Sequence, residues 1–166
     1  MDSKPDLLTV AKLAPFLMEP LQRAFTVHDR LHTQDAAAFA RVAPRIRAIC
    51  GSGESRVSAE LLAQLPALQI VSIMGVGYDG VDVAACKARG VLVTHTPDVL
   101  NDDVADLAIA LALCIARRIP QADRHVRAGR WASDGPMPLA TKLSGARMGI
   151  VGMGRIGQAI AQRARA

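Results

Sequence analysis

The sequence has 166 residues, of which 51% are hydrophobic, 21% charged and 3% aromatic. This composition is typical of a globular protein and excludes a disordered or fibrous chain. The net charge of +5 arises entirely in residues 99–166, which carry ten basic and five acidic side chains. A basic half can bind nucleic acid, a membrane surface or a phosphorylated ligand, or it can simply be a solvated arginine surface.

Strand and helix signals alternate along residues 1–98. Apolar runs bounded by Gly or Pro predict the strands, and Ser58 has the side chain of a helix N-cap. In chain order the pattern predicts a strand at 7–10, a helix at 15–25, a strand at 45–50, a helix at 59–65, a strand at 69–74, a helix at 83–88 and a strand at 91–94. This alternation predicts a doubly wound parallel sheet with helices on both faces.

A long helix is expected to follow, with Asn101 as its N-cap and Pro120 as its stop. Its apolar side chains recur on one face, at Val104, Leu107, Leu111 and Ile115. Residues 120–145 show little periodicity and are predicted to be an extended arm. The last elements are predicted to be a strand at 147–151 and a helix at 157–164.

Cellular context is indicated by the cysteines and the apolar runs. The three cysteines lie far apart in apolar stretches and form no CxxC pair, at Cys50, Cys86 and Cys114. This is typical of small buried thiols in a reducing compartment. The N-terminus has no signal-peptide plan, and no apolar run reaches the roughly 20 residues that span a bilayer. We therefore expect a cytoplasmic protein, with neither a membrane nor, given its few aromatic residues, nucleic acid as a partner.

The first glycine-rich corner, Gly75-Val76-Gly77-Tyr78-Asp79-Gly80, directly follows the predicted strand at 69–74. Ligands of parallel sheets bind at the carboxyl ends of strands, where backbone N–H groups can form a nest for a carboxylate or phosphate. The alternative is a tight turn that needs glycine for its conformation alone. The spacing by itself leaves both open.

The second corner, Gly152-Met153-Gly154-Arg155-Ile156-Gly157, has the G-x-G-x-x-G spacing of a dinucleotide fingerprint. Gly152 would make the tight turn, Gly154 would admit the pyrophosphate, and Gly157 would let the helix pack closely. The confirming acidic or basic residue is expected about 20 residues further on, outside this sequence. A structural turn therefore remains the alternative here as well.

The four histidines, His28, His32, His95 and His125, lack metal-ligand spacing, so no metal site is expected. His95 follows a predicted strand at the same sheet edge as the first glycine corner. It could line a site, or it could be ordinary polar lining.

Several motifs, taken together, resemble those of D-2-hydroxyacid dehydrogenases, most closely the hydroxypyruvate/glyoxylate reductase branch. They are the corner at 75–82, the stretch at 96–106, Gly129-Arg130-Trp131, and the run from 143 to 157, in the family's order and spacing. The resemblance implies a flavodoxin-like substrate domain over 1–98, an interdomain helix over 99–119 and a dimerisation arm over 120–145. Residues 146–166 would be the truncated first strand and helix of a Rossmann domain that binds NADP or NAD.

The resemblance also implies roles for individual residues. Gly75, Val76 and Gly77 match the loop that holds the substrate carboxylate. Val104 matches a position against the nicotinamide, and the pyrophosphate turn matches Gly152, Met153, Gly154, Arg155, Ile156 and Gly157. The arm around Trp131, with the interdomain helix, matches a homodimer contact. Many relatives carry Asn at the position of His95.

The family's catalytic Arg, Glu and His match no residue of this chain and are expected beyond Ala166. The resemblance implies an oxidoreductase that transfers a hydride between NAD(P)H and a small 2-oxoacid, with this chain an incomplete and inactive form. The alternative is a non-catalytic dinucleotide-binding or dimerising interaction module. Reading the coding sequence past Ala166 for those three residues would separate the two.

Overall fold

The structure, a computed structural model, describes residues 4–165. It forms two compact units, and the division falls between Pro97 and Asp98. The first unit comprises β1 (Asp6–Thr9), α1 (Pro15–Ala24), β2 (Thr26–Asp29), α2 (Leu31–Gln34), α3 (Ala36–Val42), a 3-10 turn (Ala43–Arg45), β3 (Ile46–Ser52), α4 (Ala59–Ala63), β4 (Ile70–Met74), α5 (Val83–Ala88) and β5 (Leu92–Thr94). The second comprises α6 (Asn101–Ala116), α7 (Ile119–Arg127), α8 (Arg130–Ser133) and α9 (Arg155–Arg165).

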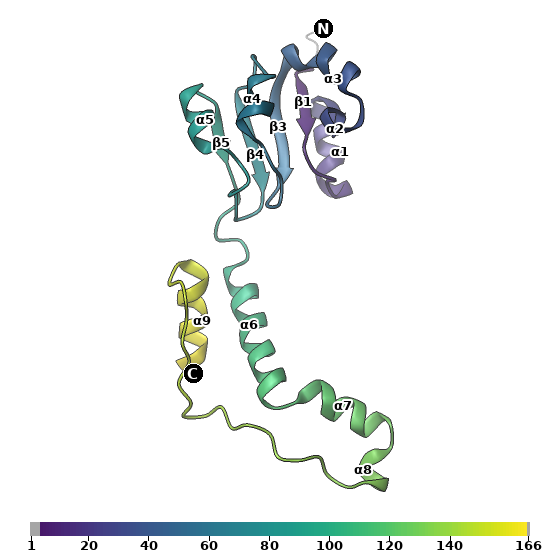
Figure 1. The fold of residues 1–166 in the computed structure, drawn as a ribbon, viewed down its shortest axis with the longest axis vertical. Helices are drawn as coiled ribbons and strands as arrows, with labels where there is room; N and C mark the ends of the chain where they lie inside the picture. Colours follow the sequence, from purple (N-terminus) through teal and green to yellow (C-terminus); the bar gives the residue numbers. More distant parts are fainter. Residues whose placement is uncertain (1–3, 166) are drawn as a thin grey trace. The chain divides into compact units, whose positions relative to one another are not determined.

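The five strands of the first unit form one parallel sheet in the order β2-β1-β3-β4-β5. Figure 1 labels four of them, β1, β3, β4 and β5, which follow one another across the sheet in this order. This is the flavodoxin-like order, in which the chain winds outward in both directions from the middle of the sheet. The predicted α/β fold class is therefore confirmed for this unit.

Helices cover both faces of the sheet because successive strand residues point to opposite sides. On one face, Leu8, Ile49 and Val71 are buried in a core completed by α3, α4 and α5. On the other face, Leu7 and Cys50 pack against α1. Side-chain caps begin three of the helices, since Asp35, Ser58 and Asp82 each accept a hydrogen bond from a backbone amide three residues on.

The second unit is built around α6 and α9, which pack against each other. Arg163 of α9 pairs with two carboxylates one turn apart on α6, Asp102 at 3.0 Å and Asp106. An extended segment, residues 134–154, connects α8 to α9. It is held by hydrogen bonds from the Thr141 amide to the Ala116 carbonyl (3.0 Å) and between His125 Nε2 and the Gly135 carbonyl (2.8 Å).

Three predictions for the second unit were wrong. Residues 147–151 form no strand, because they find no neighbouring strand among the described residues to complete a hydrogen-bonded ladder. The arm contains two helices, α7 and α8, and Pro120 lies in the first turn of α7, where a missing N–H costs nothing. Leu100 rather than Asn101 is the N-cap of α6, since the Asn101 side chain donates to Asp98 (3.0 Å).

Candidate functional site

The first glycine corner leaves β4 at the carboxyl edge of the sheet, as the sequence predicts. Gly75, Val76 and Gly77 lie at the start of this loop, and Gly77 is exposed to solvent. The amide N–H groups of Val76 and Gly77 donate no hydrogen bond to any group of residues 4–165. They are free to bind an anion from outside the fold.

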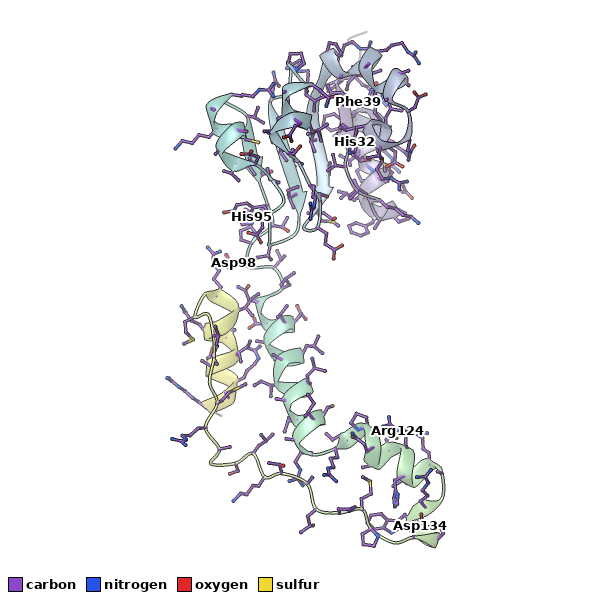
Figure 2. The ribbon with its side chains drawn as sticks, in the orientation of Figure 1. His32, Phe39, His95, Asp98, Arg124 and Asp134 are labelled. Carbon is purple, nitrogen blue, oxygen red and sulfur yellow. The ribbon has the colours of Figure 1, made fainter. Side chains whose placement is uncertain are left out.

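The loop is held from β5 by the two residues that follow that strand. Thr96 binds both polar groups of Gly75, because its amide donates to the Gly75 carbonyl (2.9 Å) and its Oγ1 accepts from the Gly75 amide (3.0 Å). His95 Nδ1 lies 2.9 Å from the Val76 carbonyl oxygen. The His95 ring also packs edge-on against Tyr78, with ring centroids 4.7 Å apart. Figure 2 labels His95 at the end of the sheet where β4 and β5 finish.

A second loop, residues 53–57 after β3, supports the corner from the other side. The Val57 amide donates to the Gly80 carbonyl (2.9 Å), and Val57 and Val81 form an isolated parallel bridge. Gly80 lies so close to the Ser55 carbonyl oxygen that an added Cβ would approach it to 2.2 Å. This supporting role of the loop after β3 was not predicted from the sequence. The signal that could have revealed it is that the two loops follow β3 and β4, which are neighbouring parallel strands and so end at the same edge of the sheet.

The second glycine corner is an exposed turn followed by a helix. Gly152 has φ of +94°, a conformation that favours glycine, and α9 begins at Arg155. An added Cβ at Gly157 would lie 2.1 Å from the Gly152 carbonyl oxygen, whereas one at Gly154 would have no neighbour within 4 Å. A dinucleotide turn needs open space at its second glycine and tight packing at its third. Gly154 has open space around it, and Gly157 is tightly packed.

Asp98 and Val104 are the other residues of the second unit that concern this turn, Asp98 through its ion pair with Arg155 and Val104 through its predicted cofactor contact. Arg155 pairs with Asp98 at 3.0 Å, and Asp98 has φ of +69°, which is uncommon for a residue other than glycine. Val104, in the second turn of α6, is 37% exposed. The predicted cofactor residues Met153, Arg155 and Val104 thus all lie in the second unit, and the predicted substrate residues all lie in the first.

Comparison with known sequences gives the family. The family described as D-isomer specific 2-hydroxyacid dehydrogenase, catalytic domain, matches residues 7–165. The chain belongs to this family. The resemblance drawn from the motifs of the D-2-hydroxyacid dehydrogenases is thereby confirmed.

Curated relatives include several reductases of 2-oxoacids. A hydroxyphenylpyruvate reductase from Plectranthus scutellarioides is 46% identical over 162 residues, covering 96% of this chain and 51% of that protein. Glyoxylate/hydroxypyruvate reductase B from Escherichia coli (strain K12) is 43% identical over 164 residues, covering 97% of this chain and 50% of that protein. The chain therefore spans about half the length of the curated relatives it matches.

Solved structures of other dehydrogenases agree with this assignment. A 2-hydroxyacid dehydrogenase from Ketogulonicigenium vulgare Y25 superposes with a TM-score of 0.91 at 45% identity, covering 99% of this chain and 52% of that one. An NADPH-dependent glyoxylate/hydroxypyruvate reductase from Sinorhizobium meliloti, in complex with NADP and malonate, gives a TM-score of 0.85 at 41% identity, covering 98% of this chain and 50% of that one.

Proposed function

We propose that this chain is the substrate-binding part, and the start of the dinucleotide-binding part, of an oxidoreductase. The enzyme transfers a hydride between NAD(P)H and a small 2-oxoacid or D-2-hydroxy acid of the hydroxypyruvate/glyoxylate type. The observation that carries the proposal is a pair of amides, at Val76 and Gly77, that have no hydrogen-bond acceptor within residues 4–165 and lie at the carboxyl edge of a parallel sheet in a member of this family.

The substrate carboxylate is proposed to bind these two amides. Two adjacent N–H donors suit an anion that has two oxygens, because each oxygen can accept one charge-assisted hydrogen bond. Gly77 permits the approach, since, apart from its two chain neighbours, the one described group within 4 Å of the position of a Cβ there is the Asp79 carboxylate, at 3.8 Å. The complex of the Sinorhizobium meliloti relative with malonate is consistent with carboxylate binding in this family.

The second corner fits a dinucleotide as far as this chain extends around it. Gly154 leaves space for a pyrophosphate. The 11-residue helix α9 begins at the next residue, so its N-terminal end lies beside that space. Arg155 and the backbone of Met153 and Ile156 would hold the phosphates, and Val104 would lie against the nicotinamide. The nicotinamide, when bound, supplies or accepts the hydride. NADP and NAD both remain within the proposal, and the Sinorhizobium meliloti relative contains NADP.

The proposal is tested with a hybrid enzyme in which this chain replaces the matching half of Escherichia coli glyoxylate/hydroxypyruvate reductase B, 43% identical to it. The hybrid is expected to oxidise NADPH or NADH with glyoxylate or hydroxypyruvate, followed by absorbance at 340 nm. The Gly77→Val variant should raise KM for the 2-oxoacid, because the side chain blocks the amides. A folded hybrid without turnover, or a Gly77→Val variant with unchanged kinetics, would contradict the proposal. A non-catalytic interaction module is the second candidate, favoured by that first result.

Dimerisation with a second copy forms part of the proposal. The apolar face predicted for α6 is exposed, with Leu107 59%, Leu111 54% and Ile115 79% accessible. Trp131 of α8 is also 60% accessible. Exposed apolar side chains of this size mark protein interfaces, and symmetric pairing of identical faces is the commonest way to cover them.

A cytoplasmic location is likewise proposed, and the thiols support it. Cys50 and Cys86 are buried and Cys114 is half-buried, all unpaired. Unpaired thiols are typical of a reducing compartment. Among the described residues, no helix has both the length and the apolar character needed to cross a membrane.

A further inference from the structure

We propose that His95 is a positioning residue for carboxylate binding, which acts through the Val76 carbonyl to aim the Gly77 amide. The inference rests on the proposed function of the Val76 and Gly77 amides and adds a residue to it. His95 comes from the end of β5, whereas the amides it would orient come from the loop after β4.

The planarity of the peptide unit links the Val76 carbonyl to the Gly77 amide. The Val76 carbonyl and the Gly77 amide belong to the same unit, and the structure contains no cis peptide bond among residues 4–165. In a planar trans unit the C=O and N–H bonds point in opposite directions. A hydrogen bond that holds the Val76 carbonyl toward His95 therefore directs the Gly77 N–H away from His95.

The preceding peptide unit is held in the same way. The Thr96 amide donates to the Gly75 carbonyl at 2.9 Å, and that carbonyl shares its peptide unit with the Val76 N–H. Two consecutive residues of the β5 end, His95 and Thr96, thus bind two consecutive carbonyls. Neither of the two amides that share a peptide unit with those carbonyls donates a hydrogen bond within the described chain.

The imidazole of His95 suits this role because its hydrogen-bond partner determines whether Nδ1 carries a hydrogen. A carbonyl oxygen only accepts, so the hydrogen of the 2.9 Å contact lies on Nδ1 of His95. The edge-on contact with Tyr78, at 4.7 Å between centroids, restricts the orientation of the ring. A donor on the carbonyl also polarises the peptide, which makes its N–H a stronger donor to an anion. This hydrogen bond from His95 to the Val76 carbonyl, called the brace below, therefore affects both the direction of the Gly77 N–H and its strength as a donor.

The test compares two substitutions at position 95 in the 166-residue chain. His95→Asn keeps a donor, since Asn Nδ2 is the same number of bonds from Cα as His Nδ1, whereas His95→Leu removes it. Amide NMR spectra of each protein would be recorded during titration with glyoxylate and, separately, malonate. We expect the Val76 and Gly77 resonances to shift on titration. The dissociation constant should rise about three- to tenfold in His95→Leu, and should stay within about twofold of the parent value in His95→Asn.

The matched control is His125→Leu, which removes another imidazole that contacts a backbone carbonyl, that of Gly135 at 2.8 Å, in the second unit. It should leave carboxylate affinity unchanged. If His95→Leu keeps its amide dispersion and binds as tightly as the parent, or if His95→Asn is as weak as His95→Leu, the brace is wrong while the carboxylate site stands. If neither amide shifts in the unsubstituted chain, the carboxylate site is wrong, and the brace with it. In the hybrid enzyme, His95→Leu should raise KM with little change in kcat.

Discussion

An added Cβ would lie 2.2 Å from a backbone oxygen at Gly80 and 2.1 Å from one at Gly157, but would meet nothing within 4 Å at Gly154. The first two glycines are therefore required by the fold itself. The third is not, because the structure leaves space around it. A single spacing motif thus combines one glycine that serves packing, Gly157, with one that has open space around it, Gly154.

This difference predicts opposite outcomes for two substitutions in the hybrid enzyme. Gly154→Val should leave the melting temperature unchanged, because there is space for the side chain. It should weaken NADPH binding roughly tenfold or more, which is about 1.4 kcal/mol, because the side chain occupies the pyrophosphate position. Gly157→Val is the control, and it should lower the melting temperature. NADPH titration by fluorescence and thermal melts are the measurements, and wild-type affinity in Gly154→Val would contradict the assignment.

His32 predicts a pH dependence of stability. Burial lowers the pKa of this histidine below 6.5, and its Nδ1 is buried with no hydrogen-bond partner within residues 4–165. Its ring lies beside that of Phe39, 6.1 Å away between centroids (Figure 2). The neutral ring is thus favoured in the folded state, while the unfolded chain takes up a proton near pH 6.5. Stability should be complete above that pH and fall as pH decreases toward the lower folded pKa.

Urea unfolding of the 166-residue chain at pH 7.5 and pH 5.5 measures this effect. The His32→Leu variant should lose much of the difference between the two conditions. Asp29 titrates in a separate window, because hydrogen bonds from Arg30 and Thr9 lower its pKa below 3.8. An equal loss of stability in the parent and in His32→Leu would assign the pH dependence to other groups.

At the scale of the elements, the sequence predicted what short-range patterns determine. The strands β1, β3, β4 and β5 lie within two residues of their predicted bounds, because each is an apolar run that ends at a turn or cap signal. The strand β2 was missed, since Thr26–Asp29 pairs only with β1 at the sheet edge and contains a single aliphatic residue, Val27. The strand predicted at 147–151 did not form, because pairing depends on distant chain that a local pattern does not describe.

The candidate site was partly predictable for the same reason. Both glycine corners were found from their spacing and from the elements beside them. The hydrogen bonds from His95 and Thr96 to the first corner were not, because they connect residues about 20 positions apart on neighbouring strands. The support from Ser55 and Val57 required the strand order β3-β4, which only the assembled sheet provides.

The exposed apolar side chains of α6 and α8 predict where two copies of the chain associate. Trp131→Ala and Leu111→Glu should each shift the hybrid enzyme toward monomer in sedimentation velocity. The first removes an exposed apolar side chain, and the second replaces one with a charged side chain. Arg127→Ala is the control, because this arginine lies on α7 and its side chain pairs, among residues 4–165, with Asp123 alone, in an exposed ion pair. A dimer that persists in both variants would place the interface elsewhere.

For the whole molecule, we expect the 166-residue chain by itself to lack dehydrogenase activity. Residues 147–151 pair with no other strand within the described chain, and Val151 is fully exposed. The proposed dinucleotide turn thus lacks, within residues 4–165, the neighbouring strands that normally fix such a turn. By the resemblance, the family's catalytic Arg, Glu and His match no residue of this sequence. NADPH and NADH would be mixed with the purified chain and with glyoxylate or hydroxypyruvate, and absorbance at 340 nm followed. Turnover above a protein-free control would reveal a catalytic site in this half.

The burial of the thiols has a consequence for chemical labelling. Burial raises the pKa of both Cys50 and Cys86, so little of the reactive thiolate forms at neutral pH, whereas Cys114 is half-buried on α6. A maleimide should therefore modify one thiol of the native chain quickly and the other two only after denaturation, as mass spectrometry would show. Because Cys114 lies on the helix proposed to meet a second copy, a fluorophore attached there would report assembly through energy transfer between labelled chains. The chain thus carries its own single attachment point for an association assay, without any engineered cysteine.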